Sequence, residues 1–295
     1  MRHDPGSRPP TDPHARTDPE PYAGARAQPP AAAGAEPRGS ARAEPRPGLL
    51  RTGVLIRHNT AVLLNEPGPL IGRLVMPLMM LLAMRPLYQA AQGGAAGTTQ
   101  AVIGSLVMFS LLALSIVGSS ILSERVWRTW DRLRVTPVRP VELLVGKAVP
   151  VLGVLAAQQV VVLGFGVVVF GMPVADPGLL VVACAVWGLA LLGMGSAVGL
   201  LAGSYGQLSA VLDIGAFLLT TLGGALVPIS TLPGWVRAVA PASPGYWGAD
   251  CLRHAAAGDT GRTLTGIAVL LAVALVGGAV AAWRVARGWG RATAI

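Results

Sequence analysis

The fold is decided by one charged stretch that lies between two long apolar runs: Glu124-Arg125-Val126-Trp127-Arg128-Thr129-Trp130-Asp131-Arg132-Leu133-Arg134-Val135-Thr136-Pro137. Residues 86–123 before it and 148–175 after it contain no Asp, Glu, Lys or Arg. A charged side chain costs about 2.5–3.5 kcal/mol at the centre of a bilayer. We therefore expect this stretch to lie in water between two membrane-spanning helices, where another protein can contact it.

The composition is typical of a membrane protein. The chain of 295 residues is 53% hydrophobic and only 13% charged, about half the charged fraction usual in a soluble domain. Further charge-free runs cover 177–212, 214–236 and 263–283, and each reaches the ~20 residues that a helix needs to cross ~30 Å of hydrocarbon. The sequence therefore predicts an all-α integral membrane protein with six transmembrane helices. The predicted spans are about 69–90, 99–122, 145–171, 178–202, 208–228 and 264–283.

Two segments precede the first span. Residues 1–47 are rich in Pro, Ala and Arg and almost free of large apolar side chains, which predicts a disordered cytoplasmic tail. Residues 48–66 alternate apolar side chains with Arg, His and Asn, which predicts a helix lying in the membrane interface; a short soluble helix is the alternative. Pro67-Gly68-Pro69 then turns the chain into the bilayer.

The region between the fifth and sixth predicted spans is too polar and too rich in Pro to cross a membrane. It carries Trp235, Tyr246 and Trp247, and aromatic rings of this kind prefer the membrane–water interface. We expect two short amphipathic helices, around 233–240 and 244–257, that dip into the outer leaflet. A surface loop is the alternative.

Basic residues indicate the topology. Arg and Lys gather before the first span, around the charged stretch and after the last span, whereas the loops near 91–98 and 172–177 contain none. The positive-inside rule then predicts both termini in the cytoplasm, which agrees with an even number of spans.

Four polar side chains within the predicted spans are candidates for the transport pathway. Arg85 either anchors its helix at the nearer interface or lies at a substrate exit. Gln158 and Gln159 either line a passage or make hydrogen bonds between helices. Asp213 either reaches the cytoplasmic headgroups or pairs with a basic residue of another helix.

Small residues predict close helix packing in the fourth span. Gly195, Gly199 and Gly203 repeat every four residues, a spacing that lets a neighbouring helix approach closely.

The sequence gives no catalytic constellation. It offers no Ser/His/Asp arrangement and no cluster of metal ligands, and Gly146-Lys147 lacks the glycine spacing of a phosphate-binding loop. We therefore expect no catalytic residue, no bound metal and no cofactor on this chain. If ATP drives its function, a separate polypeptide hydrolyses it.

The charged stretch resembles the signature of type-2 ABC exporter permeases, especially the daunorubicin-resistance-like branch of actinobacteria. The similar residues are Glu124-Arg125, Thr129 to Pro137, Pro140 to Leu144 and Gly146-Lys147, with a second patch at Pro228 to Trp235, Pro244 and Asp250 to Arg253. Arg128 stands where the family usually has Gly. The resemblance covers about residues 48–290 and implies a multi-pass protein of the bacterial plasma membrane.

The resemblance also implies partners and a coupling site. Two permease subunits would form the pathway. Separate ATPase subunits would bind ATP and Mg²⁺ and would also bind the charged stretch. The implied coupling residues are Glu124, Arg125, Trp127, Arg128, Trp130, Asp131, Arg132, Leu133, Arg134, Thr136 and Pro137. We therefore expect an ATP-driven exporter subunit for an amphipathic small molecule such as a drug or secondary metabolite. A lipid or glycan exporter of the same architecture and a non-transporting membrane anchor or sensor are the alternatives.

Overall fold

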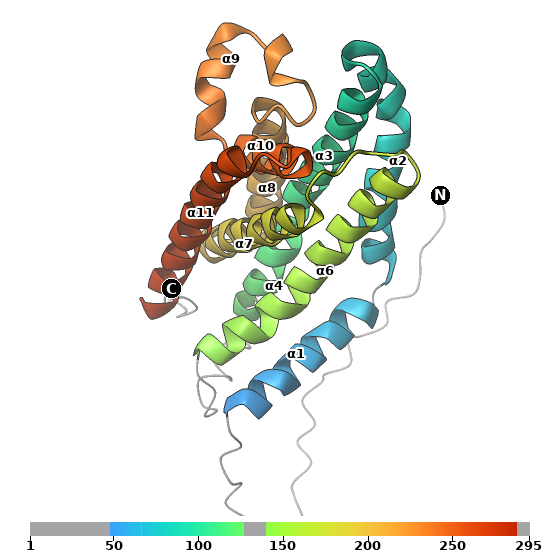
Figure 1. The fold of residues 1–295 in the computed structure, drawn as a ribbon. Helices are drawn as coiled ribbons and strands as arrows, with labels where there is room; N and C mark the ends of the chain where they lie inside the picture. Colours follow the sequence, from blue (N-terminus) through green and yellow to red (C-terminus); the bar gives the residue numbers. More distant parts are fainter. Residues whose placement is uncertain (1–47, 66, 127–139, 288–295) are drawn as a thin grey trace, which may run out of the picture. The chain divides into compact units, whose positions relative to one another are not determined.

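The structure, a computed structural model, describes residues 48–65, 67–126 and 140–287, and their regular elements are all helices. The predicted all-α class is therefore confirmed, and the predicted tail, residues 1–47, lies outside the described residues. The long helices are α1 (Gly48–Asn65), α2 (Pro67–Gln92), α3 (Gly94–Leu112), α4 (Leu114–Val126), α6 (Pro140–Val168), α7 (Pro177–Leu201), α8 (Tyr205–Leu222) and α11 (Thr260–Ala286), as Figure 1 shows. The shorter α9 (Gly234–Val239) and α10 (Pro244–Ala257) lie between α8 and α11 in the chain.

Six helical segments are long and apolar enough to cross a membrane, as predicted. They are Leu70–Gln92, Gly94–Ser123, Val145–Val168, Pro177–Leu201, Tyr205–Leu222 and Thr260–Ala286. The third and fifth end earlier than predicted because a glycine with positive φ follows each of them, Gly171 (φ 64°) after α6 and Gly224 (φ 69°) after α8. Glycine adopts this left-handed conformation without steric cost, so the chain leaves the helix there.

The second span is interrupted at one residue. Helix α3 ends at Leu112 and α4 begins at Leu114, with Ala113 between them. Arg73 of α2 donates a hydrogen bond from Nη2 to Ser115 Oγ just beyond this interruption, at 3.1 Å. Arg73 therefore contacts a neighbouring helix within the bundle.

Side-chain caps explain where three of the spans begin. Asp176 accepts a hydrogen bond from the backbone N–H of Leu179 at 2.9 Å and precedes Pro177, the first residue of α7. Ser204 caps α8 and Asp259 caps α11 in the same way. A capping oxygen satisfies one of the free N–H groups of the first helical turn, and Pro is favoured at that first position.

Small residues allow the closest helix contacts. A Cβ atom on Gly199 of α7 would lie 2.8 Å from the backbone of Gly118 in α4. A Cβ atom on Gly277 of α11 would lie 2.5 Å from the backbone of Gly193 on another side of α7. The predicted close approach at Gly195 and Gly199 is thus present, whereas Gly203 lies beyond the end of α7.

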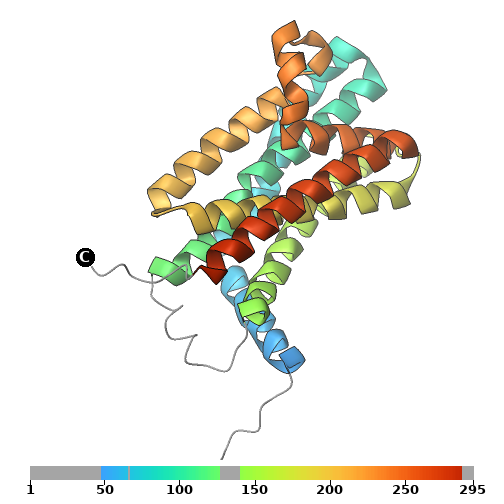
Figure 2. The same cartoon turned by 90° about the vertical axis from the view of Figure 1, so that its left-hand side faces the viewer.

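Helices α9 and α10 occupy the two positions predicted for short helices. In Figure 2 α9 lies at one end of the bundle, away from α1 and the start of α6. Helix α10 contacts α3, α7, α8 and α11, and its Ala249, Leu252 and Ala255 are fully buried. It is therefore held inside the helix bundle.

Candidate functional site

The end of the bundle that carries the charged stretch is built from α1, α4 and α6. Helix α1 packs along the start of α6, where Asn59 Nδ2 donates a hydrogen bond to the carbonyl oxygen of Gly146 at 3.1 Å. The helices can approach because position 146 is a glycine: a Cβ there would lie 2.7 Å from the Cβ of Leu55. The predicted interface helix is therefore fixed to the third span.

The two flanks of the charged stretch are linked directly. Lys147 of α6 donates a hydrogen bond from Nζ to the carbonyl oxygen of Ser120 in α4. Because α4 ends at Val126 and α6 begins at Pro140, this bond joins the helix before the stretch to the helix after it. The backbone of Glu124 and Arg125 forms the last turn of α4, and their side chains are outside the described part of the chain. The other predicted coupling residues, Trp127 to Pro137, also lie outside it.

The four predicted pathway residues are not brought together. Arg85 of α2 is half-buried, with its guanidinium carbon 4.2 Å from the ring centre of Phe170. A cation over an aromatic face is attracted by the ring's electrons. Asp213 of α8 is exposed on the surface of the chain and forms no hydrogen bond or ion pair with the residues the structure describes.

Gln158 and Gln159 of α6 are buried inside the bundle. Both amide atoms of Gln158 and the amide nitrogen of Gln159 have no hydrogen-bond partner among the described residues. Between these three atoms and the described residues, the interhelical hydrogen bonds that were one alternative are therefore not formed. A buried amide without a partner is costly, on the order of 1–3 kcal/mol.

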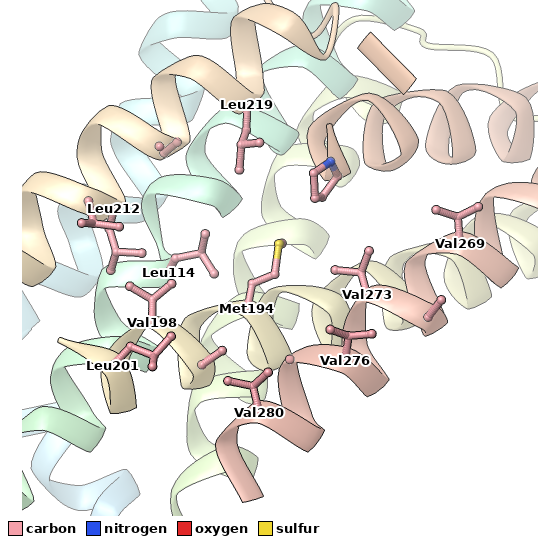
Figure 3. Close-up of a pocket in the computed structure, with 17 residues that line it drawn as sticks. Leu114, Met194, Val198, Leu201, Leu212, Leu219, Val269, Val273, Val276 and Val280 are labelled. Atoms are coloured by element: carbon pink, nitrogen blue, oxygen red, sulfur yellow. The ribbon is translucent and has the colours of Figure 1, made fainter. Parts of the chain in front are cut away.

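A cavity lies between α7, α8 and α11 and reaches Leu114 of α4 and Pro244 of α10 (Figure 3). We call it the α8 groove. Its volume is about 600 Å³, and its lining side chains are all apolar. Figure 3 shows Met194 and Val273 pointing into it from facing helices. Neither Arg85, Gln158, Gln159 nor Asp213 lines this groove.

A polar cluster at the opposite end from α1 was missed by the sequence analysis. Gln100 of α3 donates from Nε2 to the carbonyl oxygens of Gly224 and Ala225, at 3.0 and 2.9 Å. Arg253 of α10 donates from Nη1 to Gln100 Oε1 at 2.8 Å and to Gly224 O at 3.3 Å. Tyr88 of α2 donates from its hydroxyl to the carbonyl oxygen of Leu226. Three helices therefore hold the turn that follows α8.

The electrostatics of this cluster are shaped by burial. Burial lowers the pKa of the Arg253 guanidinium, and the nearby Asp250 carboxylate acts in the opposite direction. Asp250 itself is buried, with His254 Nδ1 at 3.5 Å and Arg262 Nε at 3.6 Å. The sequence signal that could have revealed the cluster is the run Asp250 to Arg253 in a segment too polar to span.

The described part of the chain combines six helical segments of membrane length with α1, which is fixed to the third of them. These features define an all-α membrane protein. The family model described as ABC-2 type transporter matches residues 51–256. Because that match covers more than half of the chain, the protein belongs to the ABC-2 type transporter family, and with six membrane-length helical segments among its described residues it is a multi-pass membrane protein.

Two curated relatives are similar to part of the chain. Each is named "Probable multidrug ABC transporter permease YbhR", one from Escherichia coli (strain K12) and one from Escherichia coli O157:H7. Each is 30% identical over 141 residues, which cover 46% of this chain and 38% of the relative. The match therefore spans about two fifths of the length of these relatives.

Proposed function

We propose that this chain is the permease subunit of an ATP-driven exporter that moves an amphipathic small molecule, such as a drug or secondary metabolite, out of the cell. The main support for the proposal is that two hydrogen bonds link α1, α6 and α4 at one end of the bundle. Asn59–Gly146 fixes α1 to α6, and Lys147–Ser120 fixes α6 to α4. A force on residues 124–137 therefore reaches three helices at once.

The force would come from a separate ATPase subunit, which would bind ATP and Mg²⁺. Alternating Glu, Arg and Asp in the charged stretch supply charge pairs that fix the register of docking, and Trp127, Trp130 and Leu133 supply an apolar anchor. The ATPase would lie in the cytoplasm, so both termini of this chain would be cytoplasmic. Two copies of the permease would complete the pathway.

The α8 groove supports an amphipathic cargo. Its walls are apolar from end to end, so the apolar part of a cargo molecule would be removed from water there, at about 25 cal/mol per Å² buried. Met194 adds an adaptable side chain, which suits cargo of varied shape. The drug-related name of the curated relatives agrees with this class of cargo.

Lipid export is a second candidate, because the same groove has no polar lining side chain. A lipid chain would fill it as well as a drug would. ATP-driven uptake of a fluorescent drug into inside-out vesicles and flip of a fluorescent phospholipid in the same vesicles separate the two candidates.

The test of coupling replaces two residues of the charged stretch. In Asp131→Asn/Arg132→Ala, ATP-driven drug transport should fall at least tenfold while the protein still inserts in the membrane at the wild-type level. The matched control is Arg237→Ala, an exposed basic residue of α9 at the opposite end of the bundle. Full transport by the double variant would contradict the proposal.

Capture of a partner provides the second readout. The wild-type chain should co-purify with an ABC ATPase that carries a phosphate-binding loop, and the double variant should not. A chain that binds no ATPase and moves no drug would instead be an anchor or sensor.

A further inference from the structure

A second groove lies between α4, α6, α7 and α11, on a different side of α11 from the α8 groove. We call it the Lys147 groove; its volume is about 400 Å³. Along α11 it runs from Leu271 to Ala282, which is about 16 Å at 1.5 Å per residue. Leu275, which lines it, is 73% exposed, so the groove opens sideways toward the hydrocarbon around the bundle.

The groove is apolar over most of its length and polar at one end. Its polar lining side chains are Ser120, Lys147 and Ser196. Lys147 lies at the end of the third span that carries α1. The Lys147 ammonium therefore lies where a membrane's hydrocarbon meets its headgroups.

A second cation lies next to the same end. Ala281 of α11 lines the groove, and Arg284 follows three residues later on the same side of the helix. Helical side chains lean toward the helix N-terminus, so the Arg284 side chain leans back toward the groove. Its Nε atom is buried and has no hydrogen-bond partner among the described residues. A buried donor of this kind needs an acceptor.

From these contacts, we propose that the Lys147 groove binds one anionic phospholipid, with an acyl chain along α11 and its phosphate between Lys147 and Arg284. The apolar walls match a hydrocarbon chain, and the two cations match a negative headgroup. Basic pockets between membrane helices favour acidic lipids in general.

The site is separate from the proposed pathway. Gly277 of α11 packs against Gly193 of α7 between the two grooves. Lipid binding at Lys147 therefore needs neither the cargo nor the ATPase, and a test of it does not depend on transport.

Native mass spectrometry of the detergent-purified full-length chain tests the proposal. Phosphatidylglycerol and phosphatidylcholine with the same acyl chains are titrated in competition, and the bound lipid is counted. The wild type should retain one phosphatidylglycerol in preference to phosphatidylcholine. Lys147→Gln and Arg284→Gln should each reduce that preference about fivefold, since a basic residue near a membrane surface attracts acidic lipid by this amount.

A variant that fills the groove tests the position of the acyl chain. Gly278 lines the groove, and a Cβ there would meet no atom within 4 Å. Gly278→Leu should therefore fold normally and lose the retained lipid. The matched control is Gly153→Leu in α6, where a Cβ also meets nothing and which lines neither groove.

Three results would overturn the proposal. Equal retention of the two lipids would show that Lys147 and Arg284 do not select an anionic headgroup. Retention of phosphatidylglycerol by Gly278→Leu would place the lipid elsewhere. A dimer that carries no lipid, beside monomers that do, would assign the groove to a second copy of the chain.

Discussion

Asn59 and Gly146 are 87 positions apart in the chain, yet the amide of Asn59 donates a hydrogen bond of 3.1 Å to the carbonyl oxygen of Gly146. This contact joins α1 to α6, the helix that follows the charged stretch. The two helices also approach closely at position 146, where a Cβ would lie 2.7 Å from the Cβ of Leu55. Displacement of one helix therefore displaces the other.

The first prediction concerns this contact. Gly146→Leu should push α1 away from α6, because its Cβ alone would come within 2.7 Å of the Leu55 Cβ. Asn59→Leu removes only the hydrogen bond, which is worth about 1 kcal/mol. We expect transport per unit of ATP hydrolysed to fall strongly in Gly146→Leu and about twofold to fivefold in Asn59→Leu.

Reconstituted vesicles with the co-purified ATPase give both rates at once. The control is Gly153→Leu, which lies about two helical turns further along α6 and has open space around it. This variant should retain wild-type coupling. If Gly146→Leu transports as the control does, α1 takes no part in coupling.

The second prediction concerns the polar cluster around Gln100. Arg253→Ala leaves the side-chain oxygen of Gln100, Oε1, without the Arg253 donor that lies 2.8 Å from it. A buried acceptor without a partner costs about 1–3 kcal/mol. The detergent-purified variant should therefore unfold at a lower temperature than the wild type, as followed by circular dichroism.

A double-mutant cycle separates this contact from general packing. Gln100→Leu combined with Arg253→Ala should destabilise the protein by less than the sum of the single variants, because residues in contact are coupled. Additive effects would mean that the two side chains do not interact in solution.

The sequence alone was sufficient to predict the six spans, because each span is predicted by an apolar run within a single short segment of the chain. A charge-free run of membrane length predicts a membrane-spanning helix at any position in the chain. Three of these helices begin directly after a residue whose side chain caps them, namely Asp176, Ser204 and Asp259. The close approach of Gly199 was likewise visible in the four-residue spacing. These features depend on neighbours in the chain.

The rest of the site depends on residues that are distant in the chain. Gln100 and Arg253 are 153 positions apart, and neither is part of a repeat or motif that points to the other. The two grooves are spaces between side chains of several helices, α4, α7, α8, α10 and α11 for one and α4, α6, α7 and α11 for the other. Helix periodicity predicts which side of one helix is apolar, but it does not predict which neighbour leaves a space there.

The third prediction concerns helix packing at Gly199. In Gly199→Leu, the new Cβ would lie 2.8 Å from the backbone of Gly118, and the backbone cannot rotate aside as a side chain would. Overpacking of this kind costs about 1–3 kcal/mol or more. The variant should show a lower unfolding temperature or a lower yield of folded protein on size-exclusion chromatography.

Gly72→Leu in α2 is its control, because a Cβ there meets nothing within 4 Å. Equal stability of the two variants would contradict the contact between α4 and α7.

The fourth prediction concerns topology. Ser230, in the turn before α9, and His58 of α1 are both exposed, and the proposed topology places them on opposite sides of the membrane. In a chain with both native cysteines replaced by alanine, Ser230→Cys should react with a membrane-impermeant maleimide in intact cells. His58→Cys should react only after the membrane is permeabilised, and the reverse pattern would invert the proposed topology.

The fifth prediction concerns the thiol of Cys251. The side chain is fully buried in α10, 3.7 Å from the carbonyl oxygen of Thr263. Burial, followed by the negative charge of Asp250, raises the pKa of the Cys251 thiol to about 11. The thiolate is the reactive form, so at pH 7.5 only a very small fraction of the Cys251 thiols is ready to react, even where a reagent gains access.

Maleimide labelling of Cys184→Ala as a function of pH measures this directly. In the folded protein the labelling rate should rise about tenfold per pH unit up to about pH 11, whereas in denaturant it should level off near the ordinary thiol pKa of about 8.5. Asp250→Asn should shift the folded-state profile only partly toward lower pH, because burial is the larger cause of the raised pKa.

Rapid labelling of the folded protein at pH 7.5 would show that α10 leaves its position between α7 and α11. The variant Gly266→Ala checks this interpretation. Its Cβ would lie 2.7 Å from the Cβ of Cys251, so it should loosen α10 and accelerate labelling without changing the profile in denaturant.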